Sequence, residues 1–573
     1  MTTATWKAQP LSGAWNTANN WNPATVPVDI AMFAVSAQTA ISFIADNSAQ
    51  VNSIEFAADA PAFTFTLATS TSPSLTLAGP GVINQSQKQQ SFIVAATSQG
   101  YQNPQLRFVN SASAGGADMF YCVGPETEQG YGGGVICFCN SATAGAASFK
   151  VWTGAAKPPQ HSTVGGEVSF CDTSSAGSGR FTVYGSLGAD GDTFGNVVFH
   201  NDATADSATF TNLGGTVAGG DGGNTQFYGD SSAANGHFYN WGGSHTQANG
   251  GDVAFDATAT GGQGYFYNYA ARAAGAYGGV TSFNNNPPDV ATSGASAGDG
   301  SYFNYGAREG ELGGGGHLEF SAKYGSPTAA SATIINYGST IESKSSAGHT
   351  IFSITLPTAY FPSAGNATIW NHPGASAGGA AGFTEFSVYG SGSASNMPTA
   401  GAATLLNLGA YTEGGVGGYT VFSGIASAAN ATLIAYGGSN GGKGGRIVFY
   451  DDACGSRAKV QLFGNGELDI ADHSQGVTID TLELTGGIIT VQLGQKTTAL
   501  TVSNKLYMLA AYTSFEFYSH AEDGFEFNTA YTILIGADLS GFSEDQFRGN
   551  SIEGIAPAFT IEGDCLKVSF LQS

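Results

Sequence analysis

Phenylalanine ends a short alternating phrase twelve times along the chain. Phrases such as GGDVAF (250–255) and GGHLEF (315–320) alternate polar and apolar residues, and in eleven of the twelve a glycine stands four residues before the phenylalanine. Alternation with a period of two is typical of a β-strand with one buried face, and the glycines indicate a turn at its start. The pattern therefore predicts equivalent short strands that end at Phe108, Phe138, Phe170, Phe199, Phe227, Phe255, Phe283, Phe320, Phe352, Phe386, Phe422 and Phe449.

A second phrase follows within each unit and predicts a second strand. Small residues come first and β-branched or aromatic residues follow, as in ATADSATFTN (203–212) and TAGAATLLN (399–407). The two phrases together form a unit that repeats every 31 residues on average. An asparagine recurs at the end of the second strand, at Asn212, Asn240, Asn268, Asn304, Asn336, Asn371 and Asn407.

The length of the repeat decides the fold class. A unit with two short strands cannot bury an apolar face alone, so it must coil and stack on its neighbours. Stacking places Phe over Phe and Asn over Asn about 4.8 Å apart, where the amides form ladders. Since parallel crossovers are right-handed, we predict an all-β fold: a single-stranded right-handed parallel β-helix (β-solenoid) with N- and C-terminal capping segments. The repeat is too short for β-propeller blades, and no 3.6-residue period favours a helical solenoid.

Changes along the chain predict four segments. Residues 1–100 form an N-terminal cap and the first β-helix turns, and residues 101–465 form a glycine-rich β-helix of about twelve repeats. Residues 466–510 alternate simply and predict plain β-helix turns, and residues 511–573 predict a C-terminal β cap. Caps are expected because an open coil end exposes apolar core and unpaired strand edges.

Composition and charge exclude several classes of function. Glycine contributes 84 of 573 residues without a Gly-X-Y period, which excludes collagen. The chain has 18 basic and 42 acidic residues, a net charge of −24. Nucleic acids and anionic membrane surfaces attract basic proteins, so neither is expected as a partner. No apolar run of about 18 residues predicts a membrane-spanning helix.

The cysteines and the first residues bear on the compartment. MTTATWKAQPLSGAW has one lysine and no apolar core, so it is not a Sec signal peptide, and the export route stays open. Six cysteines in 573 residues do not form a disulfide scaffold. Cys139 and Cys171 follow the repeat phenylalanine directly and should lie in adjacent turns. In-register stacking gives poor disulfide geometry, which favours free thiols there over a bridge.

Several segments resemble bacterial surface proteins with autotransporter-associated β-strand repeats. The resemblance is carried by SGAWNTANNWNPATVPVDIAMF (12–33), LTLAGPGVINQSQKQQSFIV (75–94), SAGNAT (363–368), ATAGAAS (142–148) and YTILIGADLSGFSEDQF (531–547). It implies a parallel β-helix that is exported or displayed on the surface, with a role in adhesion or surface structure. It carries no catalytic motif.

An enzymatic function is the main alternative, because polysaccharide lyases and glycosidases also have parallel β-helix folds. If the repeat phenylalanine points inward, the residues one and three before it point outward. Glu319 and Glu385 would then lie two turns apart, near the separation of an inverting glycosidase pair. The competing interpretation is a solvated strand face, which we prefer because the row also contains Ala254 and Val421.

Metal and sugar sites have weak sequence support. His317 and His349 should stack, but a structural zinc site needs four ligands. Asp190, Asp192 and Asp221 lie in glycine-rich loops, so calcium is possible, although no known calcium-loop spacing occurs. Asp451 and Asp452 fit a turn better than a catalytic doublet. The tryptophans at 6, 15 and 21 could stack on a sugar but more often close the end of a coil.

The sequence therefore predicts no catalytic, cofactor-binding or metal-binding residue. We expect a non-enzymatic structural or adhesive β-solenoid of a bacterial surface or extracellular assembly. Its partner would be further copies of itself, in fibres or sheets, or surface glycans and proteins. The alternatives are a polysaccharide-active β-helix enzyme, either a lyase or a glycoside hydrolase, and a carbohydrate-binding adhesin with an exposed aromatic row.

Overall fold

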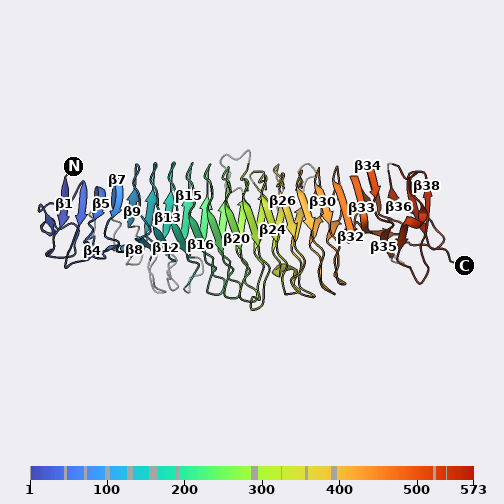
Figure 1. Ribbon diagram of the computed structural model, residues 1–573, viewed down its shortest axis with the longest axis horizontal. Helices are drawn as coiled ribbons and strands as arrows, with labels where there is room; N and C mark the ends of the chain where they lie inside the picture. Colours follow the sequence, from blue (N-terminus) through green and yellow to red (C-terminus); the bar gives the residue numbers. More distant parts are fainter. Residues whose placement is uncertain are drawn as a thin grey trace. The chain divides into compact units, whose positions relative to one another are not determined.

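The chain divides into two compact units, Met1–Thr281 and Ser282–Ser573. Figure 1 shows the computed structural model. Each unit is a parallel β-helix in which a strand pairs with the equivalent strand of the next turn. The structure describes residues 2–43, 48–69, 74–96, 104–124, 133–153, 165–187, 193–284, 294–323, 325–354, 359–388, 397–519, 524–536 and 538–572.

The first unit begins with strands of unequal length and continues with regular turns. Its early elements are β1 (Thr3–Trp6), η1 (Ala18–Asn20), β2 (Trp21–Asn22), β3 (Ile30–Phe33), β4 (Ala40–Ser42), β5 (Ala49–Phe56), β6 (Thr64–Thr69), β7 (Ser74–Asn84) and β8 (Gln90–Ala96). The regular turns contain β9 (Gln105–Phe108), β10 (Met119–Val123), β11 (Val135–Phe138), β12 (Ser148–Val151), β13 (Glu167–Phe170), β14 (Arg180–Val183), β15 (Asn196–Phe199), β16 (Thr209–Asn212), β17 (Asn224–Phe227), β18 (His237–Asn240), β19 (Asp252–Phe255) and β20 (Tyr265–Asn268). The unit boundary falls within β21 (Val280–Asn284).

The second unit is also built from two-strand turns and ends in longer strands. Its regular elements are β22 (Ser301–Asn304), β23 (His317–Ala322), β24 (Thr333–Asn336), η2 (Lys344–Ser346), β25 (His349–Ile354), β26 (Thr368–Asn371), β27 (Phe383–Val388), β28 (Thr404–Asn407), β29 (Tyr419–Phe422), β30 (Thr432–Ala435) and β31 (Arg446–Phe449). The remaining elements are β32 (Lys459–Asp469), β33 (Gly476–Leu493), β34 (Ala499–Met508), β35 (Thr513–Ser519), β36 (Tyr531–Ile535), η4 (Glu544–Gln546), β37 (Phe547–Gly549), β38 (Ala558–Glu562) and β39 (Cys565–Ser569).

Phenylalanine rings form a continuous buried column in each unit, as the repeat predicts. In the first unit Phe227 lies 4.6 Å from Phe199 and 4.7 Å from Phe255, centroid to centroid, with nearly parallel planes. In the second unit Phe352 lies 4.7 Å from both Phe320 and Phe386. These side chains are fully buried. The period-2 pattern is therefore confirmed as strands whose phenylalanine faces the core.

A ladder of buried asparagines accompanies each phenylalanine column. Asn212 Nδ2 donates to Asn240 Oδ1 at 2.9 Å, and Asn240 Nδ2 donates to Asn268 Oδ1 at 2.8 Å. The second unit repeats this from Asn304 through Asn336 and Asn371 to Asn407. Within the ladder each amide thus pairs with the amide of the next turn, in an interior where an unpaired polar group is costly.

The repeat glycine is required by a close backbone approach. A Cβ atom at Gly251 would lie 2.2 Å from the carbonyl oxygen of Asn212, and one at Gly418 would lie 2.0 Å from that of Asn371. No side chain fits at such distances, which explains why glycine stands four residues before the phenylalanine.

The two chain ends are closed differently. Trp6, Trp15 and Trp21 are buried, and Trp21 contacts each of the other two edge-on at 5.0 Å. They therefore fill the end of the coil and are not exposed as a sugar platform. Near the C-terminus β39 pairs antiparallel with β36 and β38. Within the described residues, no helix is long and apolar enough to cross a bilayer.

Candidate functional site

Loops leave the second unit at the same place in each turn. The residue after the ladder asparagine points outward, and its carbonyl accepts from the backbone N–H of the repeat glycine that starts the next strand. Gly348 N donates to Tyr337 O at 2.9 Å, and Gly382 N donates to His372 O at 2.8 Å. Each of these hydrogen bonds closes one loop at its base. The loops of successive turns therefore lie side by side.

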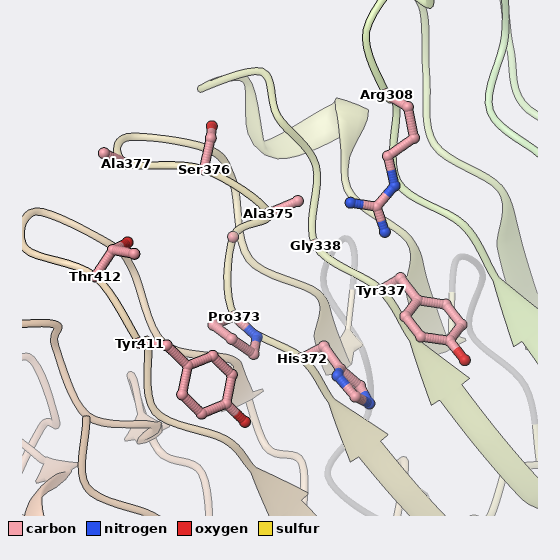
Figure 2. Close-up of a pocket in the computed structure, with 11 residues that line it drawn as sticks. Arg308, Tyr337, Gly338, His372, Pro373, Ala375, Ser376, Ala377, Tyr411 and Thr412 are labelled. Atoms are coloured by element: carbon pink, nitrogen blue, oxygen red, sulfur yellow. The ribbon is translucent and has the colours of Figure 1, made fainter. Parts of the chain in front are cut away.

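Four such loops line a hollow of about 380 Å³, which we call the Arg308 hollow. Figure 2 shows that the side chains of Tyr337 and His372 lie beside each other at the ends of their strands, with Arg308 on one side and Tyr411 on the other. The lining residues are Arg308, Tyr337, Gly338, His372, Pro373, Gly374, Ala375, Ser376, Ala377, Tyr411 and Thr412.

An outward aromatic column runs into the hollow. The rings of Tyr305 and Tyr337 stack at 5.0 Å with planes 8° apart. The ring of His372 lies 5.0 Å beyond Tyr337 but is tilted by 36°. The regular stacking of the column is therefore lost at His372, which Pro373 follows immediately.

The charge of the hollow resides in one group. Arg308 is exposed and is the only Lys, Arg, Asp or Glu among the lining residues. Its backbone N–H donates to Glu311 Oε2 at 2.8 Å. Burial, and secondarily the charge of Arg308, lowers the pKa of His372. The imidazole is therefore neutral at pH 7 and offers one donor and one acceptor.

Polar groups of the loops complete the lining. Ser376 Oγ donates to the carbonyl of Thr340 at 3.1 Å, which fixes the hydroxyl of one loop against the preceding loop. Tyr411 is 61% exposed at the opposite wall. The hollow combines a guanidinium, a neutral imidazole, phenol and aliphatic hydroxyls, and an accessible aromatic ring. Such a set can bind a polar ligand by hydrogen bonds and one ionic contact.

The carboxylates singled out in the sequence lie two turns apart on the same strand face. Glu319 lies opposite Ile351, which in turn lies opposite Glu385, so the predicted separation of two turns is confirmed. Lys344 Nζ contacts Glu385 Oε2 at 2.9 Å and lies 4.6 Å from the ring of Phe383. Burial raises the pKa of Glu319. One carboxylate is thus held in an ion pair, and an isoleucine side chain lies between the two.

The two histidines continue an outward column and do not converge on a third ligand. His317 and His349 stack at 5.1 Å, and His349 stacks on Phe383 at 4.8 Å. Burial lowers the pKa of His317 to about 3 and that of His349 to about 4. Among the residues that the structure describes, no group of three or more His, Cys, Asp or Glu side chains is placed to hold a metal ion.

The remaining sequence candidates have structural partners where they are described. Asp221 Oδ1 accepts from Asn249 Nδ2 at 2.7 Å. Asp451 Oδ2 accepts from the backbone N–H of Gly424 at 2.9 Å, and its φ of 54° is that of a turn residue, as predicted. Asp190 and Asp192 lie outside the described residues.

The cysteines are free thiols in the structure, including Cys139 and Cys171. Burial is the main cause that raises the pKa of Cys139, and burial raises the pKa of Cys137 to about 12. These thiols are therefore protonated at neutral pH and are poor nucleophiles. Their position supports packing in a column, not chemistry.

Sequence reasoning did not find the Arg308 hollow. A signal existed, because Tyr337 and His372 each directly follow a ladder asparagine, and Tyr305 does so one turn earlier. The phase of the repeat therefore predicts an outward column at this position. Arg308 and Tyr411 lie in loops of variable sequence, and nothing in the strand pattern brings these two residues together.

Comparison with models of known protein families finds no match, and neither does comparison with curated proteins. The resemblance to autotransporter-associated repeat proteins therefore stays a prediction. The fold, a parallel β-helix in each unit, and the geometry of the Arg308 hollow are what constrain function.

Proposed function

We propose that this protein is a structural and adhesive β-solenoid that acts outside the cell or on a bacterial surface and catalyses no reaction. The observation that carries the proposal is the interior phenylalanine column of each unit, together with the asparagine ladder that runs beside part of it. Identical groups in successive turns make every turn support the next, so a unit resists local opening. This mechanical continuity suits a spacer or a scaffold.

The outward faces support an adhesive role. Hydrogen bonds and stacked rings tie the strand faces together, whereas the loops differ in length and residue type from turn to turn. In the first unit, β18, β20 and the residues that directly follow these strands present three stacked ring pairs: His237 with Tyr265, Tyr239 with Tyr267, and Trp241 with Tyr269. Tyr265 is 40% exposed. Such an aromatic surface, on a chain in which only 10% of the residues are charged, favours lateral association of copies.

The arrangement of carboxylates supports a non-enzymatic function. A glycosidase needs an acid and a base that are both free to face one substrate, whereas Glu385 is held in an ion pair with Lys344. Reducing-end release from pectin, alginate and host glycans tests this directly. We expect no release above the background. Release that is abolished by Glu319→Gln or Glu385→Gln would instead establish the enzyme.

Electron microscopy tests the proposed self-association. We expect concentrated protein to form fibres or sheets by lateral contact, and Tyr265→Ser to reduce their number. Asn235→Ser, an exposed substitution in the neighbouring turn, serves as the matched control. Monodisperse particles at high concentration, with and without calcium, would contradict self-association.

A further inference from the structure

We propose that the Arg308 hollow binds a carboxylate-bearing sugar unit of an acidic polysaccharide. The inference rests on the adhesive part of the proposed function and adds the chemical class of its partner. It depends on three features of the second unit: an available guanidinium, an aromatic ring with accessible faces, and neutral hydrogen-bonding groups between them.

The guanidinium of Arg308 is available to an anion. The chain carries a net charge of −24, so each cation has many possible carboxylate partners. Even so, the guanidinium of Arg308 forms no ion pair with the residues that the structure describes. The carboxylate of the nearby Glu311 accepts the backbone N–H of Arg308. A guanidinium binds a carboxylate through two parallel hydrogen bonds, which gives geometry as well as charge.

Tyr411 has accessible ring faces, whereas the rings in the stacked columns of the strands do not. Along a column each ring covers its neighbour's faces, as Tyr239 and Tyr267 do at 4.9 Å. Only ring edges then reach the solvent. Tyr411 lies in a loop, is 61% exposed, and stacks on no described ring. The negative face of such a ring attracts the C–H groups of a pyranose.

The neutral groups favour a sugar over other anions. A sugar presents hydroxyls and a single carboxylate, and the lining of the hollow contains the imidazole of His372, the hydroxyls of Tyr337 and Thr412, and a single cation. A phosphate or sulfate ester would be better served by several cations or by a nest of backbone amides. A volume of about 380 Å³ lies at the small end of ligand sites and suits one or two sugar rings.

The first unit contains a comparable loop that lacks this arrangement. Arg272 lies over the ring of Trp241, with its guanidinium carbon 5.8 Å from the centroid, and Tyr277 is 57% exposed. This arginine is therefore already engaged with an aromatic face. The pair Arg272 and Tyr277 supplies matched controls for Arg308 and Tyr411.

Calorimetric titration of the full chain with tetragalacturonate tests the proposal. We expect saturable binding at pH 7, and much weaker binding of the neutral tetragalactose. Arg308→Ala should weaken the affinity at least tenfold, and Arg308→Lys should weaken it less because the charge stays. Tyr411→Ala should weaken it several-fold. Arg272→Ala and Tyr277→Ala should leave it unchanged, and circular dichroism should show that every variant is folded.

Three outcomes would overturn the proposal: no binding of tetragalacturonate, equal binding of the neutral sugar, or an equal loss in Arg272→Ala and Arg308→Ala. Failure here is separable from failure of the proposed function. If Arg308→Ala assembles in electron micrographs like the unchanged protein while no sugar binds, the scaffold stands and the ligand assignment falls. If sugar binds but no assembly forms, the ligand assignment stands alone.

Discussion

Residue types recur from turn to turn much more strictly on the inward face of the strands than on the outward face of the same strands. On the inner face of β17 and β19, Phe227 lies opposite Phe255. On the outer face of the same two strands, Asn224 lies opposite Asp252 and Gln226 lies opposite Ala254. The interior is close-packed, so a change in one turn must be matched by the next. The outer face has no such constraint and is free to differ, which is where binding groups can accumulate.

The largest expected effect breaks the inner column. Phe227→Ala removes a fully buried ring that contacts Phe199, Phe238 and Phe255. We expect it to destabilise the first unit by about 3–5 kcal/mol. Hydrogen exchange of β15–β20 should report this as faster exchange in those strands. Gln226→Ala, one residue away on the outer face, is the control and should cost less than about 1 kcal/mol. Equal effects of the two substitutions would remove the distinction between the faces.

The second effect breaks the amide ladder. Asn240→Ala removes two ladder hydrogen bonds and leaves Asn212 Nδ2 and Asn268 Oδ1 each short of one partner. The loss should be about 2 kcal/mol, measured by urea unfolding. Asn235→Ala changes an exposed asparagine of the same turn and should be nearly neutral. A neutral Asn240→Ala would mean that the ladder adds no stability.

The third effect concerns an outward column and depends on pH. His317 and His349 stay neutral in the folded state because burial lowers their pKa values to about 3 and about 4. The unfolded chain takes up protons below about pH 6.5. Stability is therefore complete above this pH and falls as pH drops toward 4.

Replacing both histidines isolates this contribution. His317→Phe combined with His349→Phe extends the column of Phe383 with rings that do not titrate. Urea midpoints at pH 7 and pH 4.5 should differ less in this variant than in the unchanged protein. Glu319, whose raised pKa acts in the opposite direction, is common to both proteins. Identical pH profiles would show that the two imidazoles are not shielded from water.

The smallest expected effect is a gain at the end of a ladder. Asn407 Nδ2 is buried without a hydrogen-bond partner, because Ala435 occupies the next position of the column. The backbone at Ala435 is equivalent to that at Asn407, because a repeat glycine approaches each carbonyl in the same way. A Cβ at Gly466 would lie 2.3 Å from Ala435 O, and one at Gly445 would lie 2.0 Å from Asn407 O. Ala435→Asn supplies an acceptor to Asn407 Nδ2 but places its own Nδ2 opposite Leu462, so it should add no more than about 0.5 kcal/mol, seen as a slightly higher urea midpoint. Ala435→Leu has no acceptor and should give no gain.

The inner face could be predicted from the sequence and the loop surface could not. Identical residues recur at equivalent positions of the repeat, and this fixes the strand register. The Phe column, the Asn ladder and the two-turn separation of Glu319 and Glu385 can therefore all be predicted from the sequence. The hollow depends on how loops of unequal length lean together, and Arg308 and Tyr411 come from turns 103 residues apart in the chain. The division between Thr281 and Ser282 is likewise marked by no change of composition.

The ladder asparagines also bear on how such a chain changes its length over evolution. Asn240 accepts from the turn before it and donates to the turn after it. A duplicated turn spliced in beside it would inherit both of these partners, and its phenylalanine would fall into the existing column. Duplication or deletion of a whole turn should therefore change the stability of the fold little. An insertion or deletion of a few residues inside a strand would instead place a phenylalanine ring opposite an asparagine amide. Evolution can thus lengthen or shorten the protein by one repeat at a time, while the packing of its interior stays the same.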